Sequence, residues 1–406
     1  MQMNLYSPIV AEKSYKLTNT DCFFVFLLLF VSGNPLAIYT TDWTYVITCG
    51  FLIVYTIAKK VKLCDKRFFL VLTALCIVYI MQKFTLGRVS IAADINSVLK
   101  IYCGYLVVSI LGKKFRVAYL KVMYFICVIS LLGFSLNMLL GNIPGYSFDR
   151  YHTLFLYNYL DVENSIGFSY RNAGMFWEAG AFQGYINIAF LLYVDSFKEF
   201  LKQYKKYFIV LVAALITTFS TTGFIAFGII VTIVMLKYVK RISLKFASLI
   251  FVAFISMWAY SSFDFLGEKI IAEYEESQDI TNIGIASSRM GSAIISLESL
   301  MRHPICGNGY LLDTRYDISF GDFNGGGNGF FGTMNILGIP MMLLYFVLLY
   351  KNVPTSSIFL RMSFVLVVIL LLQGEYFLNY PLFWSLLFIY YPEYEYEKNR
   401  HITYCT

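Results

Sequence analysis

The sequence has few charged residues: Asp, Glu, Lys and Arg make up 14% of its 406 residues, while 58% are hydrophobic and 18% aromatic. Soluble globular domains carry about 25% charged residues, so this composition excludes an ordinary soluble protein and indicates an integral membrane protein. Histidine is rare, with three residues and no Cys/His cluster, so the sequence predicts no metal site and no cofactor. The eight cysteines show no paired spacing, which favours free thiols over disulfides.

The sequence instead contains a succession of apolar runs. A helix needs about 20 apolar residues to cross a bilayer, and the first run lacks the small-residue site of a cleaved signal peptide. We therefore predict an all-α integral membrane protein, one polytopic domain over residues 1–406 with about 12 transmembrane helices. The predicted helices lie near residues 21–40, 42–58, 68–84, 90–111, 117–140, 175–194, 206–220, 223–236, 246–262, 328–350, 357–378 and 380–391.

The net charge of +7 raises the possibility of a nucleic-acid partner, but the positions of the basic residues explain it better. With the N-terminus inside, most Lys and Arg residues fall on one side of the membrane, as the positive-inside rule requires of cytoplasmic connections. The pattern predicts an N-in, C-in topology and no nucleic-acid partner. The basic connections lie at residues 59–67, 112–121, 198–206 and 237–245.

Two longer segments, 141–170 and 262–327, are predicted to be external loops. The first is rich in Tyr, Asn and Phe, which is typical either of a surface that stacks on sugar rings or of an interfacial aromatic belt. The second, between the ninth and tenth helices, begins with an acidic run that is typical of a solvated face. It then contains a short amphipathic helix from Arg289, capped by Ser287 or Ser288 and ended by Pro304. We expect this helix to lie across the mouth of a membrane cavity.

Arg171 and Glu178 are charged residues at the entrance to a predicted membrane helix. An ionised side chain in hydrocarbon costs about 2.5 kcal/mol or more, so such residues mark a candidate functional site. If the helix extends back to Arg171, both charges can face one cavity, because residues three, four and seven apart lie on one side of a helix. The alternative is a buried Arg–Glu pair that only joins two helices.

Arginines also collect in the predicted external segments, where the positive-inside rule disfavours them. Guanidinium groups suit bidentate binding of phosphate oxygens, so the pattern predicts an anion site on that side. Each arginine taken singly is also typical of a helix end. These residues are Arg88, Arg150, Arg289, Arg302 and Arg315, together with Arg171.

Three motifs resemble those of the O-antigen polymerase and O-antigen ligase superfamily. The first is R-x-x-G-x-F-x-E in Arg171, Gly174, Phe176 and Glu178, and the third is NGFFGTMNILGIP from Asn328. The second is R-x13-HP-x-x-G-x-G in Arg289, His303, Pro304, Gly307 and Gly309. The order of the motifs, the long late loop and the number of helices also match, over roughly residues 80 to 350.

The resemblance implies a glycosyltransferase of surface polysaccharide and lipopolysaccharide biosynthesis. Its donor is a glycan on undecaprenyl pyrophosphate, and it works at the periplasmic face of the bacterial inner membrane without a metal or a nucleotide sugar. Implied partners are the bilayer, a chain-length regulator and a flippase. Ligases carry a histidine before the Asn that opens the helix after the large loop, whereas Gly327 precedes Asn328 here, which favours the polymerase.

In this mechanism Arg171 and Arg289 hold the leaving pyrophosphate, and Glu178 accepts the proton of the acceptor hydroxyl. Asp149, Asp161 and Asp322 are weaker candidates for the base, and Glu375 is either structural or functional. The residues predicted to bind the substrate elsewhere are Arg88, Arg150, Arg302, Arg315, His303 and Asn328.

A second class of function, a lipid-linked oligosaccharide flippase or solute permease, also has about twelve helices and buried charges. Transporters place discontinuous helices and ionisable groups near the membrane midplane, often in both halves. Here the charges lie in the outer loops and at helix ends, which favours an enzyme acting on an exported substrate. A structural membrane scaffold would explain the apolar composition but not the clustered arginines.

Overall fold

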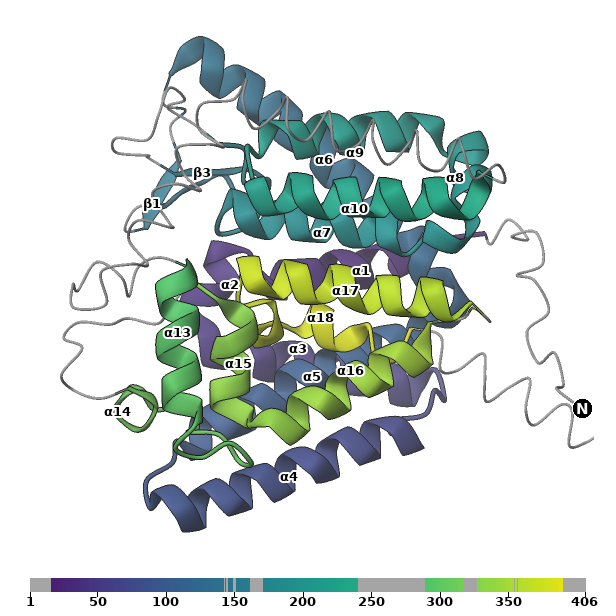
Figure 1. Ribbon diagram of the computed structural model, residues 1–406. Helices are drawn as coiled ribbons and strands as arrows, with labels where there is room; N and C mark the ends of the chain where they lie inside the picture. Colours follow the sequence, from purple (N-terminus) through teal and green to yellow (C-terminus); the bar gives the residue numbers. More distant parts are fainter. Residues whose placement is uncertain are drawn as a thin grey trace, which may run out of the picture.

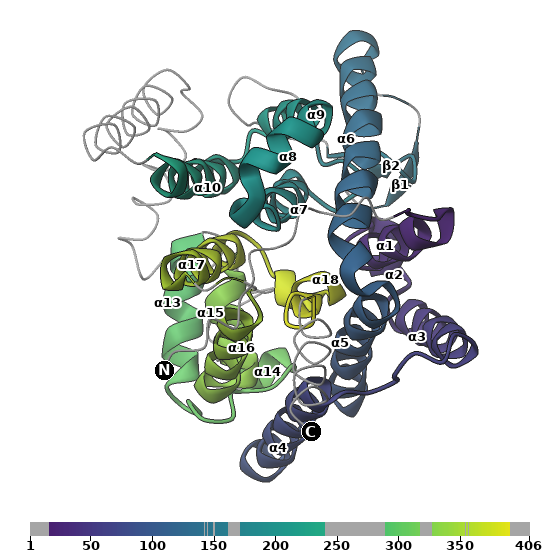
Figure 2. The same ribbon diagram turned by 90° about the vertical axis from the view of Figure 1, so that its right-hand side faces the viewer.

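The computed structural model describes residues 16–141, 143, 145–148, 151–160, 171–239, 289–316, 327–353, 355 and 357–389. These residues are mainly helical, and most of the helices run side by side in one bundle (Figure 1). A view along the bundle shows many of the same helices end-on (Figure 2). A mainly helical architecture is therefore confirmed for this part of the chain. The predicted helix at 246–262 lies outside the described residues, as does much of the second external loop.

The first half of the chain forms two groups of helices with a small sheet between them in the sequence. Glycine or a capping Ser, Thr, Asn or Asp stands at most of the helix boundaries, as helix ends favour. The helices are α1 (Asn19–Val31), α2 (Pro35–Tyr39), α3 (Thr41–Ala58), α4 (Lys66–Leu86), α5 (Ile91–Leu111), η1 (Gly112–Lys114), α6 (Phe115–Leu140), α7 (Ala179–Leu191), η2 (Val194–Ser196), α8 (Phe197–Gln203), α9 (Lys205–Thr217) and α10 (Thr221–Tyr238).

The second half adds helices of two orientations. In Figure 1, α13 and α15 stand upright at one end of the bundle, beside the end of α17, while α16 and α17 run with the bundle. The helix predicted to begin at Arg289 is thus confirmed. The elements are α13 (Arg289–Leu300), α14 (Leu312–Arg315), α15 (Gly329–Leu337), α16 (Ile339–Asn352), α17 (Ile358–Gly374), η5 (Phe377–Asn379) and α18 (Pro381–Ser385).

Within the described residues, three helical stretches are long and apolar enough to cross a membrane: Lys66–Leu86, Thr221–Tyr238 and the continuous stretch Ile91–Leu140. The bent pair α15–α16 makes a fourth if it counts as one span, and there are shorter apolar helices at Asn19–Val31, Trp43–Ala58 and Ile358–Gly374. These helices support a membrane protein. The number of about twelve spans stays a prediction.

The two ends of the bundle carry different basic residues. At the lysine end, Lys114 Nζ lies 3.0 Å from Asp21 Oδ2 at the start of α1, and Lys237 Nζ lies 2.6 Å from Asp195 Oδ1 just after α7. At the opposite end, the arginine end, Arg171 Nε donates to the carbonyl of Thr218, between α9 and α10, at 3.0 Å. The helices α13 and α15 cross this arginine end (Figure 1).

The segment predicted as one helix over 328–350 is two helices, α15 and α16, bent by 118°. The bend is at Gly338, whose φ of +82° is a left-handed conformation that glycine adopts at little cost. The carbonyl groups freed by the break are satisfied: that of Asn335 accepts from the Asn308 N–H at 2.7 Å, and that of Ile336 accepts from Gln82 Nε2 at 2.7 Å. Irregular backbone is tolerated at membrane depth only when it is satisfied in this way.

Three other predicted helices differ from the structure at their ends. The run 21–40 is split into α1 and α2, because the Asn34 side chain caps a second helix that begins at Pro35. The helix predicted at 175–194 begins only at Ala179. The prediction of a helix over 380–391 is wrong within the described residues, where the short α18 gives way to turns.

The chain is not purely α-helical, because the first external segment contains a small antiparallel sheet. Its strands are β1 (Tyr146–Phe148), β2 (Tyr151–Thr153) and β3 (Asn158–Leu160), paired in the order β1-β2-β3 with Tyr146 opposite Thr153. Tyr157 and Tyr159 form a small buried cluster with Phe134 of α6. The sheet is thereby attached to the arginine end of the bundle.

Candidate functional site

The segment that leads into α7 is held by Asn172 and Gly174. Asn172 is fully buried; its amide nitrogen donates to Thr217 Oγ1 at 2.8 Å, and its side-chain oxygen accepts from the Gly174 N–H at 3.0 Å. Gly174 has a φ of +59°, in the left-handed region that favours glycine. This anchored turn fixes the positions of Arg171 and Glu178 relative to each other.

The prediction that Arg171 and Glu178 share a stripe of one helix is wrong. Glu178 is the N-cap residue of α7, in an extended conformation with φ −158° and ψ 167°, and the turn at Gly174 precludes a helix before it. The two charges nevertheless interact: burial lowers the pKa of Arg171, and the Glu178 carboxylate acts in the opposite direction. Arg171 nevertheless stays protonated, because a guanidinium group is charged throughout the ordinary pH range.

Two carboxyl groups flank Gly180 in the first turn of α7. A methyl group added at Gly180 would overlap Oε1 of Glu375 and lie 3.3 Å from Oε1 of Glu178. Glu375 directly follows the last residue of α17 and is 8% exposed. Glycine at this position therefore allows carboxyl groups from the start of α7 and the end of α17 to meet.

Arg289, the first residue of α13, brings a second cation to these carboxyl groups. Its Nη2 lies 3.5 Å from Glu375 Oε1, and its Nη1 lies 3.4 Å from Oγ1 of Thr222 at the start of α10. Arg171 donates from Nε to the carbonyl of Thr218 at 3.0 Å. We call the resulting group the Arg–Glu cluster: Arg171, Glu178, Arg289 and Glu375.

The electrostatics of the Arg–Glu cluster combine two cations with two interacting carboxyl groups. Burial raises the pKa of Glu375 well above its usual range, the neighbouring Glu178 raises it further, and the two arginines partly offset these effects. Each carboxyl group therefore disfavours ionisation of the other. The two guanidinium groups are the groups of the cluster that can bind an anion.

Arg88, Arg302 and Arg315 form a separate group around α14. The 12 residues of α13 span about 18 Å, which separates Arg289 at its start from Arg302 beyond its end. Arg88 Nη1 pairs with Asp313 Oδ2 at 3.0 Å in an exposed position, where an ion pair contributes little to stability. The described arginines that were predicted to form an external anion site thus lie in two groups.

The contacts of this second group shape the loop after α13. Arg302 donates to Ser299 Oγ at 2.8 Å and to the Arg315 carbonyl, while Arg315 donates to the Tyr310 carbonyl at 3.2 Å. The carbonyl of His303 accepts from the Gly307 N–H at 2.8 Å in the following turn. Substrate binding by these arginines and by His303 stays a prediction.

Asn328 links α15 to α13 beside the Arg–Glu cluster. Its side-chain oxygen caps α15 by accepting from the Phe331 N–H at 3.1 Å, and its own N–H donates to Ser292 Oγ at 3.1 Å. The next residue, Gly329, packs directly on the backbone of Glu375. Asn328 therefore supports the position of Glu375, and direct binding of substrate by Asn328 stays a prediction.

Four of the predicted residues lie outside the described part of the chain: Arg150, Asp149, Asp161 and Asp322. The residue that the sequence left undecided is Glu375, which the structure adds to the cluster. The signal for it was present, because an acidic residue in the apolar run LLQGEYF is costly unless it has partners. Its partners lie on helices about 80 to 200 residues earlier in the sequence, which no local pattern reveals.

No family model matches the chain, and no curated protein shows significant similarity to it.

Proposed function

We propose that the protein polymerises oligosaccharide repeat units carried on undecaprenyl pyrophosphate, as the resemblance of its three sequence motifs to those of O-antigen polymerases implies. The observation that best supports this function is the Arg–Glu cluster, where two guanidinium and two carboxyl groups meet at the end of the bundle that α13 crosses. A buried site with two guanidinium groups suits a pyrophosphate better than a neutral solute.

We further propose that the lysine end faces the cytoplasm and the arginine end faces the periplasm of a bacterial inner membrane. The described parts of the Lys-rich connections lie at the former, as the positive-inside rule requires. The substrate then enters from the outer leaflet, with its pyrophosphate at the Arg–Glu cluster and its sugars toward the small sheet. Tyr159 and His152 of this sheet stack on each other, with ring centroids 4.8 Å apart.

In the proposed reaction, Arg171 and Arg289 stabilise the negative charge that develops on the departing pyrophosphate. The acceptor hydroxyl oxygen bonds to the anomeric carbon, the bond from that carbon to the pyrophosphate oxygen breaks, and undecaprenyl pyrophosphate leaves with the electron pair. The hydroxyl proton passes to the carboxyl pair. Glu178 or Glu375, in its ionised form, is the base that accepts this proton.

Transport is the second candidate, and one observation favours it: the pair α15–α16 is discontinuous, as in many transporters. Transporters with inverted repeats usually break a helix in both halves. Within the described residues, α15–α16 is the one pair bent in this way. The bend also has a structural explanation, since it places Gly329 and Gly332 against the backbone and ring of residues 375–376. The enzyme therefore stays the first proposal, with the ligase as its nearest alternative.

Deletion of the gene distinguishes the three functions through the surface polysaccharide. Loss of a polymerase leaves a core bearing a single repeat unit, loss of a ligase leaves bare core, and loss of a flippase leaves the unit trapped on the inner side. We expect the first result. Bare core or trapped units would refute polymerisation.

Complementation then tests the Arg–Glu cluster. Arg171→Ala and Arg289→Ala should each reduce long chains by about a hundredfold or more, because each removes a charge that acts on the leaving group. Lys206→Ala, an exposed change at the lysine end, serves as the matched control and should restore normal chains. Full-length chains from both arginine variants at normal protein level would show that the clamp is wrongly assigned.

A further inference from the structure

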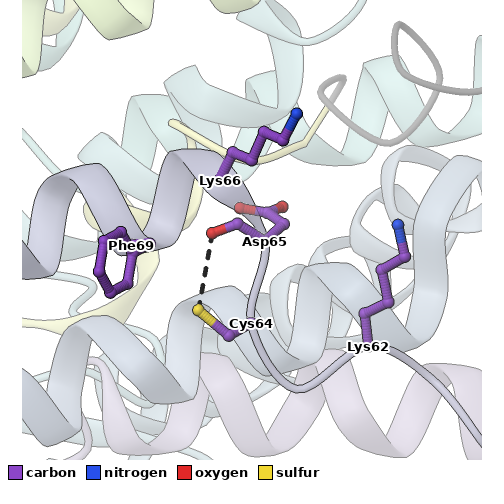
Figure 3. Close-up of a pocket in the computed structure, with 5 residues that line it drawn as sticks. All are labelled: Lys62, Cys64, Asp65, Lys66 and Phe69. Atoms are coloured by element: carbon purple, nitrogen blue, oxygen red, sulfur yellow. Dashed lines mark hydrogen bonds between the residues drawn. The ribbon is translucent and has the colours of Figure 1, made fainter.

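A surface hollow lies at the lysine end, far from the Arg–Glu cluster, where α3 connects to α4. It has a volume of about 340 Å³ and is lined by Lys62, Cys64, Asp65, Lys66 and Phe69. Figure 3 shows Phe69 on one side of the hollow and Lys62 on the other, with Asp65 between them. The hollow thus combines an aromatic wall with a basic wall.

The hollow lies at the boundary between apolar and basic surface. Phe69 and Leu70 of α4 are 62% and 46% exposed, and Val54 and Ile57 of α3 are 67% and 58% exposed. Exposed apolar side chains on a membrane-spanning helix face lipid tails. Because Lys66 begins α4, a helix long and apolar enough to cross a membrane, the hollow sits at the depth of lipid headgroups.

The charges around the hollow favour a phosphate group. Lys62 and Lys66 are exposed and line the hollow together with Asp65, whose Oδ1 also accepts from the Phe68 N–H at 2.8 Å and so caps α4. Arg67 is turned inward, where its Nη1 donates to Asn352 Oδ1 at 2.8 Å. The lining therefore carries two positive charges and one negative charge, an excess of one positive charge.

We propose that this hollow binds an anionic phospholipid, with the headgroup phosphate at Lys62 and Lys66 and the upper part of an acyl chain against Phe69. Lysines next to a membrane surface attract anionic lipids, and their long stems reach headgroup oxygens while the adjacent aromatic ring stays in the apolar layer. The occupant supports the position of α4 and is not the substrate of the proposed transfer reaction.

Native mass spectrometry of the full-length protein in neutral detergent tests this proposal, with phosphatidylglycerol and phosphatidylcholine as the probes. We expect tighter binding of phosphatidylglycerol, and we expect Lys62→Gln with Lys66→Gln to weaken it by at least about tenfold. Phe69→Ala should weaken both lipids, since it removes the chain contact. Inorganic phosphate should compete poorly, because it lacks an acyl chain.

A matched control is Lys202→Gln with Lys206→Gln, which removes the same charge from exposed positions at the same end of the bundle. Unchanged phosphatidylglycerol binding in this control supports a defined site. Equal losses in both double variants would overturn the proposal in favour of diffuse attraction. Equal binding of the two lipids, or competition by phosphate at matched concentration, would overturn it as well.

Discussion

The glycine between the two carboxyl groups provides the sharpest test of the Arg–Glu cluster. In Gly180→Ala, the added methyl group occupies the place of Glu375 Oε1. That oxygen must retreat by about 1 Å to reach an ordinary contact distance. The same oxygen lies 3.5 Å from Arg289 Nη2 in the native protein, so the displacement changes its distance to this cation. The substitution therefore displaces a charged group without removing it.

The expected effects on stability and on activity differ in size. The atom that moves is the end of a flexible side chain, so the steric cost is at the low end of the range of about 1 to 3 kcal/mol for overpacking. Replacing glycine by alanine in a helix recovers up to about 1 kcal/mol. A shift of about 1 Å in a catalytic group reduces the rate by about a hundredfold. Gly180→Ala should fold almost normally and polymerise poorly.

The assay is the length distribution of surface polysaccharide in a complemented deletion strain, with protein level and melting temperature measured in parallel. Gly50→Ala is the matched control, because a methyl group at Gly50 in α3 meets nothing within 4 Å. Its chains should be normal and its melting temperature equal or slightly raised. If Gly180→Ala also gives normal chains, the arrangement of Glu178 and Glu375 does not matter for the reaction and the proposed base is wrong.

Three further predictions concern stability. Burial raises the pKa of Glu375 above its value in the unfolded chain, so the folded state binds more protons and stability falls as pH rises from about 4.5 through the raised pKa. Glu375→Gln should remove this dependence of stability on pH. The melting temperature of the variant should then exceed that of the native protein by an amount that grows toward alkaline pH. Parallel curves of melting temperature against pH for the two proteins would contradict the raised pKa. Gly329→Ala should reduce the free energy of unfolding by about 1 to 3 kcal/mol and lower the melting temperature clearly more than Gly50→Ala does. The added methyl group overlaps the backbone of Glu375, which cannot move as a flexible side chain can. Asn172→Ala should cost about 1 to 3 kcal/mol in denaturant unfolding, since it leaves the buried N–H of Gly174 without its acceptor; a loss below about 0.5 kcal/mol would show that Asn172 is not the anchor.

Composition and local spacing predicted the helical character of the chain and several helix limits. The amphipathic helix from Arg289 was readable because polar and apolar residues alternate with helical spacing up to Pro304. The helix lies across the end of the bundle (Figure 1), and its place at the mouth of a cavity stays a prediction. The seven described cysteines are free thiols, as the sequence predicted, and Cys64 and Cys76 among them are exposed.

Other features were set by contacts that a hydropathy pattern does not contain. The run through α15 and α16 is continuously apolar, and only Gly338 and Pro340 hint at its break. Arg171 and Glu178 were predicted to lie on one face of a single helix, but a turn joins them instead. Glu375 joins them because α17 packs beside α10, a tertiary contact between distant segments.

The break between α15 and α16 has a consequence for how the protein is made. With nine residues, α15 is about 13 Å long, far too short to enter a bilayer as an independent span. Its terminal carbonyls find donors on Asn308 and on Gln82, both of which leave the ribosome earlier. We expect the insertion machinery to hold this half-helix until the older segments are in place, so the biogenesis of the protein, and not only the finished fold, depends on the earlier insertion of α4.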